Sequence, residues 1–148
     1  MIKINTYSGD NTPSEAIQQE VVNFLFESLE QYGDPKEDIK KCMDYALGKN
    51  NKPGGRVLSA IDSESQKIVG AVIINKTGMD GYIPENILVY IATDKNMRGK
   101  GVGKQLMQTA VNLSDGDMAL HCEPDNPAKF LYEKLGFTSK YLEMRLKK

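Results

Sequence analysis

The stretch from Glu85 to Lys104, ENILVYIATDKNMRGKGVGK, places a strand pattern directly before a glycine-rich, basic loop. Residues 87–92 form a continuous β-prone apolar run, which predicts a strand buried on both faces of a sheet. After the loop, apolar side chains recur at helical spacing at Val102, Leu106, Ala110 and Leu113. The loop therefore connects a buried strand to the start of a helix.

A loop of this kind favours phosphate groups, because the first N–H groups of a helix lack intrahelical partners and the helix dipole is positive there. Its glycines remove every second side chain, and its basic residues add positive charge. The glycines are Gly99, Gly101 and Gly103, and the basic residues are Arg98, Lys100 and Lys104. The combination suits a pyrophosphate better than a neutral ligand.

Two common phosphate loops do not fit the spacing. A Walker loop needs four residues between its glycines and a Ser or Thr after the lysine, but Gly99 and Gly103 enclose three residues and Gln105 follows Lys104. The dinucleotide fingerprint needs its third glycine three positions after the second, whereas Gly103 comes two after Gly101. Both alternatives are excluded.

The spacing of Arg98, Gly101 and Gly103 instead resembles the acyl-CoA loop of the GCN5-related N-acetyltransferases, the GNAT family. A second resemblance lies in residues 125–137, DNPAKFLYEKLGF, and together the likeness covers about residues 56–148. It implies that acetyl-CoA is the cosubstrate. The implied acetyl-CoA contacts are Ile91, Ala92, Thr93, Arg98, Gly99, Lys100, Gly101, Val102, Gly103, Lys104, Asp125, Asn126, Ala128 and Tyr132.

One position departs from the family pattern. The family usually has Asn seven residues before the tyrosine, where this chain has Asp125, followed by Asn126. Asp125 can accept a hydrogen bond or cap a helix, but its carboxylate cannot donate as an amide does. The departure puts one cofactor contact in doubt.

Composition limits the other possibilities. The 148 residues suit one domain, and 19 basic against 20 acidic residues give no general excess of the kind that favours nucleic acid or an anionic membrane as a partner. The N-terminal residues lack the apolar core of a signal peptide, so we expect a soluble, cytoplasmic protein. Cys42 and Cys122 lack metal-ligand spacing, and we expect buried thiols and no metal.

The first third of the chain predicts a strand at Ile2–Thr6 and a helix over residues 14–30. A second helix is expected to start with Asp34 as its cap and Pro35 at its first position, and to stop at Gly48. A polar, glycine-rich loop follows at residues 49–55. The resemblance implies that residues 25–55 form the wall of the acceptor site.

The central and C-terminal parts predict more strands. Residues 57–62 and 67–75 read as a hairpin, in which Gly70 marks a bend or a close approach. A short strand at 118–122 and a helix capped by Asp125 or Asn126 are expected next. The alternating residues 141–146 are expected to close the sheet.

These elements predict a single-domain α/β fold, and the resemblance implies that it is the acyl-CoA N-acyltransferase (GNAT) fold. We expect a mainly antiparallel, mixed sheet of six or seven strands flanked by helices. The single domain spans residues 1–148, with acceptor-side helices and loop at about 8–55 and the acetyl-CoA-binding core at about 85–137.

The chemistry implied by the family is direct transfer of an acetyl group to an amine, which needs a base, donors for the oxyanion and an acid for the leaving thiolate. The resemblance points to Tyr132 as the acid and to Glu85, thirteen residues before Arg98, as the base. His121 or an ordered water are the alternatives for the base, and Tyr90 is expected to line the same cleft. Backbone N–H groups at about residues 91–93 are implied as the oxyanion donors.

The leading hypothesis is therefore acetyl-CoA-dependent N-acetylation of a primary amine, carried by a small molecule or by a protein. A non-catalytic CoA-binding sensor or interaction module of the same fold is the alternative, and transfer of a longer acyl group is a third. No motif identifies the acceptor. Homodimers are common in the family, so the resemblance is compatible with a homodimer, but it does not fix the oligomeric state.

Overall fold

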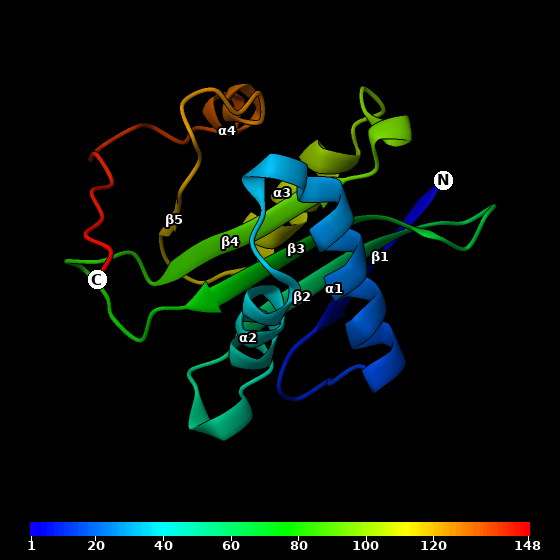
Figure 1. The fold of residues 1–148 in the computed structure, drawn as a ribbon, viewed down its shortest axis with the longest axis horizontal. Helices are drawn as coiled ribbons and strands as arrows, with labels where there is room; N and C mark the ends of the chain where they lie inside the picture. The colour runs from blue at the N-terminus through cyan, green and yellow to red at the C-terminus, as the bar shows by residue number, and fades with distance from the viewer.

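The computed structural model describes residues 1–148 as a five-stranded sheet with helices on both faces (Figure 1). The strands are β1 (Ile2–Tyr7), β2 (Gly55–Asp62), β3 (Ile68–Lys76), β4 (Asn86–Thr93) and β5 (Met118–Leu120). The α-helices are α1 (Glu15–Leu29), α2 (Lys36–Ala46), α3 (Val102–Leu113) and α4 (Lys129–Lys134). Short 3₁₀ turns are η1 (Glu30–Tyr32), η2 (Lys49–Asn51) and η3 (Lys95–Met97).

The order of strands across the sheet is β1-β2-β3-β4-β5. The first three pairings are antiparallel, and β5 runs parallel to β4 after a crossover through α3. This mainly antiparallel, mixed sheet confirms the predicted α/β fold class, with five strands instead of six or seven.

Two apolar clusters lie on opposite faces of the sheet. Helices α1 and α2 cover one face, with Leu25, Ile39 and Met43 fully buried against Ile73 of β3. Helix α3 covers the other face, where Leu106 and Met107 pack with side chains of the same strands. Both faces of β3 and β4 are thus buried, which explains their continuous apolar runs.

The start of α2 differs from the prediction. The first helix forms over nearly the predicted range, and Ser14 caps α1, with its hydroxyl accepting from Ile17 N–H at 3.3 Å. Asp34, however, does not cap α2: the helix begins one residue later than expected, with Pro35 at the cap position and no capping side chain. The Asp34 carboxylate is used elsewhere. Gly48 ends the helical segment as predicted, in a left-handed conformation.

The predicted hairpin is confirmed as β2 and β3, and the close approach at Gly70 is confirmed with it. A Cβ at Gly70 would lie 2.6 Å from Leu106 Cδ1 and 3.1 Å from Val102 Cγ1. Only a residue without a side chain lets α3 pack this closely on β3.

The predicted end of the sheet is not formed. Strand β5 stops at Leu120, so His121 and Cys122 lie outside it, and residues 138–148 contain no strand. Their apolar side chains are 81–88% exposed: Tyr141, Leu142, Met144 and Leu146. An alternating pattern is not enough for a strand here, because it gains no burial without a face to pack on. Both cysteines are half-buried free thiols, less buried than expected.

No helix of this chain combines the length and the apolar character that crossing a bilayer would require.

Candidate functional site

The candidate site is a gap between β4 and the chain that follows β5. The two strands pair only at Asn86–Leu88 with Met118–Leu120. Beyond Leu88, β4 continues for five residues, 89–93, that have no partner in β5. Since neighbouring strands in a sheet lie ~4.8 Å apart, the missing pairs leave the C-terminal half of β4 with an open edge.

A bulge in β4 lies where this gap begins. Tyr90 pairs with Ile73 and Leu88 pairs with Ile74, so Val89 is an extra residue without a partner. The extra residue reverses the alternation of the strand. Leu88 therefore packs beneath α3, and Tyr90 packs beneath α1 and α2.

The open edge presents backbone donors. Asp94 N–H donates to Val69 of β3, and N–H groups alternate between the two edges of a strand. The N–H groups of Ile91 and Thr93 therefore face the gap, whereas that of Ala92 faces β3. Two of the three predicted backbone positions thus have the orientation that an oxyanion donor needs.

The glycine-rich loop lies at the C-terminal end of β4 and starts α3. Gly99 and Gly101 have φ values of 80° and 81°, and a Cβ at either would meet nothing within 4 Å. Residues 101–104 donate none of their N–H groups to a backbone carbonyl. The loop thus combines open space with a row of free donors at a helix start, as an anion requires.

The charges around this loop are unpaired. Arg98, Lys100 and Lys104 are all exposed, and none of them forms an ion pair. Three free cations beside free N–H groups fit a pyrophosphate, and the loop therefore fits the acyl-CoA group that the sequence implies.

Helix α4 packs against the start of α3. A Cβ at Gly103 would lie 3.3 Å from Leu131 Cδ2 and 3.6 Å from Thr93 Cγ2, so three predicted regions meet at this glycine. Asn126, not Asp125, shapes the turn before α4: its Oδ1 accepts from Ala128 N–H at 3.0 Å. The Asp125 side chain is exposed.

Tyr132 of α4 is 7% exposed and packs edge-on against Phe137, with ring centroids 6.2 Å apart. Every fully buried side-chain N or O atom has a hydrogen-bond partner except Asn75 Oδ1. The Tyr132 hydroxyl forms no hydrogen bond and is not among these buried atoms, so it reaches the surface. Burial raises the pKa of Tyr132 to about 12, with a smaller effect from the Cys122 thiol. The phenol therefore stays protonated at neutral pH.

A family model described as an acetyltransferase (GNAT) domain matches residues 53–139, more than half of the chain. The chain belongs to the GNAT acetyltransferase family. The match includes β4, the glycine-rich loop and α4, and confirms the family that the two sequence signatures predicted. Among curated proteins, no sequence relative is found for this GNAT chain.

Solved structures share the GNAT fold at low sequence identity. The protein PH1933 from Pyrococcus horikoshii OT3 is 24% identical over 97% of this chain and 93% of its own, with a TM-score of 0.69. Ribosomal-protein-alanine N-acetyltransferase from Brucella melitensis biovar Abortus 2308 is 16% identical over 99% of both chains, with a TM-score of 0.64. Aminoglycoside N-acetyltransferase AAC(6')-Iy, solved with CoA, is 14% identical over 100% of this chain and 95% of its own, with a TM-score of 0.71.

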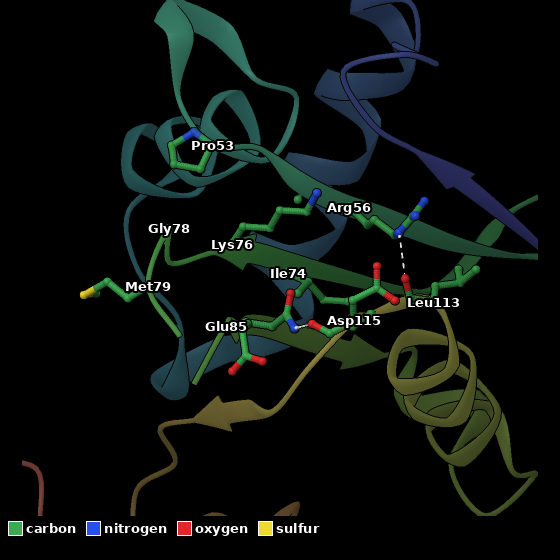
Figure 2. Close-up of a pocket in the computed structure, with 12 residues that line it drawn as sticks. Pro53, Arg56, Ile74, Lys76, Gly78, Met79, Glu85, Leu113 and Asp115 are labelled. Atoms are coloured by element: carbon green, nitrogen blue, oxygen red, sulfur yellow. Dashed lines mark hydrogen bonds between the residues drawn. The ribbon is translucent and has the colours of Figure 1, made fainter. Parts of the chain in front are cut away.

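Glu85 lies apart from the rest of the predicted GNAT site. It precedes the N-terminus of β4, and the loop follows the C-terminus, about 26 Å away at ~3.3 Å per residue. Figure 2 shows Glu85 in a pocket with Arg56, Lys76 and Asp115, near the C-terminal end of α3. The structure does not bring Glu85 and Tyr132 together.

The other candidate base, His121, and the expected cleft residue Tyr90 do not join the site either. His121 is exposed, just beyond β5. Tyr90 is 7% exposed and donates to Asp34 Oδ2 at 2.6 Å, so its proton is already engaged. No group of three or more His, Cys, Asp or Glu side chains is placed to hold a metal ion.

Sequence reasoning missed two features of this GNAT site. One is the bulge at Val89, which no residue type announces. The other is a pair of contacts made by the segment between α1 and α2, which lies within the predicted acceptor wall: Tyr32 Oη donates to the Asp125 carbonyl at 3.4 Å, and Asp34 Oδ2 accepts from Tyr90. A tyrosine inside the apolar run 87–92 was the available signal, because a buried phenol needs a hydrogen-bond partner.

Proposed function

We propose that this GNAT domain transfers the acetyl group of acetyl-CoA to a primary amine. The observation that carries the proposal is the meeting of the loop and the gap: the free N–H groups of residues 101–104 lie after the end of β4, whose C-terminal half has an open edge. Acetyl-CoA would supply an activated acyl group on a thiolate leaving group. The solved relative AAC(6')-Iy was crystallised with CoA, which supports the same cosubstrate here.

Each part of the site has a role in this proposal. Residues 98–104 bind the pyrophosphate through backbone N–H groups and cations. The N–H groups of Ile91 and Thr93 stabilise negative charge on the acyl oxygen. As the amine nitrogen bonds to the acyl carbon, the carbon–sulfur bond breaks, and Tyr132 donates a proton to the departing sulfur.

The amine must lose its proton before or during attack, and we retain Glu85 for this role. Its position at the far end of β4 requires that it act through water molecules along the strand. A solvent water that takes the proton directly is the simpler alternative. Loss of activity in Glu85→Gln at saturating substrates would support Glu85, and unchanged activity would favour water.

The test begins with cosubstrate binding. At a hundred times Kd, acetyl-CoA should stabilise the folded chain by about 2.7 kcal/mol and raise its melting temperature by about 5 to 10 °C. Arg98→Ala should lose most of this shift, whereas Lys67→Ala, an exposed lysine in the β2–β3 turn, should keep it. No shift in the wild type at millimolar acetyl-CoA would contradict the proposal.

Thiol release over a panel of primary amines then tests transfer itself. The remote place of Glu85 favours one alternative, a CoA-binding module without catalysis. Acetyl-CoA binding that is lost in Arg98→Ala, with no amine-dependent thiol release, would support that alternative.

A further inference from the structure

The inference concerns Asp34, in the segment that joins α1 to α2. This residue is exposed, yet its Oδ2 accepts a 2.6 Å hydrogen bond from Tyr90 of β4, whose ring is buried. Burial and this hydrogen bond raise the pKa of Tyr90, so the phenol keeps its proton and remains a donor. An exposed carboxylate is thus fixed in place by the core.

This carboxylate has spare capacity for a ligand. Tyr90 occupies one oxygen, and no lysine, arginine or histidine forms an ion pair with Asp34. Lys36, two residues later, instead points over the Phe26 ring, 5.2 Å from its centroid. Because a carboxylate can accept at four lone-pair sites, Asp34 can take a further charged donor.

The place of Asp34 relates it to the gap. Tyr32, two residues earlier, reaches the carbonyl of Asp125 in the loop before α4. Residues 32–34 therefore connect β4 to the loop that bears Asp125, on the sheet face opposite α3. Figure 1 shows the segment between α1 and α2 crossing in front of the sheet. The glycine-rich loop starts α3 behind the sheet, and acetyl-CoA would bind there. Asp34 lies on the opposite side, from which the acceptor amine would approach.

A second acidic side chain adds to the effect of Asp34 at the Tyr90 hydroxyl. Asp34 and Asp38 both act electrostatically on the Tyr90 hydroxyl, which places both carboxylates near it. Their field attracts an ammonium group and repels a carboxylate attached beside the amine.

We propose that Asp34, held by Tyr90, is a specificity-determining residue that binds the ammonium group of a cationic amine acceptor and selects against amino acids. This rests on the proposed acetyl transfer. The acceptor class is a diamine or a similar amine without a nearby carboxylate.

The experiment compares 1,5-diaminopentane with lysine, which differ by one carboxylate. The wild type should favour the diamine in kcat/KM by about tenfold or more, the effect of one hydrogen bond to a charged group. Asp34→Asn keeps an oxygen that can accept from Tyr90 but removes the charge. It should bring the ratio close to one by raising KM for the diamine, with KM for acetyl-CoA unchanged. Asp80→Asn, which removes an exposed acid far from the gap, should keep the wild-type ratio.

Two outcomes separate this inference from the proposed function. Transfer with no diamine preference, or with a preference that survives Asp34→Asn, would overturn the inference and leave the function standing. If no amine releases thiol, calorimetric titration of the CoA-loaded protein with 1,5-diaminopentane decides: binding lost in Asp34→Asn supports the inference without catalysis. No binding by the wild type would overturn it.

Discussion

The Tyr32 hydroxyl donates to the Asp125 carbonyl across 3.4 Å, although 93 positions separate the two residues. The contact joins the segment between α1 and α2 to the loop before α4, and the Asp34–Tyr90 hydrogen bond ties the same segment to β4. Both halves of the proposed site are therefore linked by a single long hydrogen bond at the surface.

We expect Tyr32→Phe to affect the acceptor side more than stability. The bond is long and exposed, so its loss should lower the free energy of unfolding by about 0.5 kcal/mol or less. Freedom gained by residues 32–34 should raise KM for the amine several-fold. Urea unfolding and steady-state kinetics measure the two effects. An unchanged KM would mean that the contact does not position the segment.

Tyr132→Phe should lower kcat more than it affects binding of acetyl-CoA. The variant keeps the ring against Phe137 and removes only the hydroxyl that reaches the surface. Loss of a general acid should reduce kcat by about 10² or more, with little change in Kd for acetyl-CoA. Single-turnover thiol release and calorimetry test this. Tyr141→Phe, which removes a hydroxyl from an exposed ring, is the matched control.

Gly70→Ala should destabilise the fold by about 1 to 3 kcal/mol, because the new methyl group would collide with Leu106 on α3. Gly81 offers the contrast: its surroundings are open, so an alanine there meets only the backbone cost of its φ of +70°, about 1 kcal/mol. Denaturant unfolding of both variants provides the comparison.

A double variant identifies the cause. If the collision is responsible, Leu106→Ala should recover part of the Gly70→Ala loss in a double-mutant cycle. Strictly additive effects would point to the backbone instead.

Stability should fall in alkali because of Cys42. Burial raises the pKa of this thiol from 9.0 to about 12. The folded chain therefore holds a proton that the unfolded thiol releases above its ordinary pKa. The contribution is complete below pH 9 and is lost as pH rises toward 12.

Urea unfolding from pH 8 to pH 11 tests this expectation in the wild type and in Cys42→Ala. The variant should lose less free energy of unfolding with rising pH than the wild type, and Cys122→Ala controls for removing one thiol. Parallel pH dependence in the wild type and Cys42→Ala would contradict the assigned cause.

The sequence predicted the parts of the fold that rest on local patterns. The helical stripe of α3, the α1 helix, the β2–β3 hairpin and the close approach at Gly70 all follow from spacing and residue size. The glycine-rich loop is also recognisable from local sequence, because its glycines and cations are enough to predict an anion site.

Features set by tertiary context were not predictable in this way. Asp34 has the residue type of a helix cap, but its carboxylate accepts a hydrogen bond from the buried phenol of Tyr90, 56 positions away, and does not cap α2. The bulge at Val89 depends on the register between β3 and β4. Residues 141–146 have the alternation of a strand but no face to cover, so pattern alone overstated the sheet.

The short pairing of β4 with β5 has a consequence for the order of folding. Strands β1 to β4 join through long antiparallel ladders, whereas β5 joins through three residue pairs after a crossover. Parallel pairing across a crossover is slow, because the whole connection between the two strands must close before their contacts form. We therefore expect a refolding chain to condense its central sheet first and to become competent for acetyl-CoA only in a later kinetic phase.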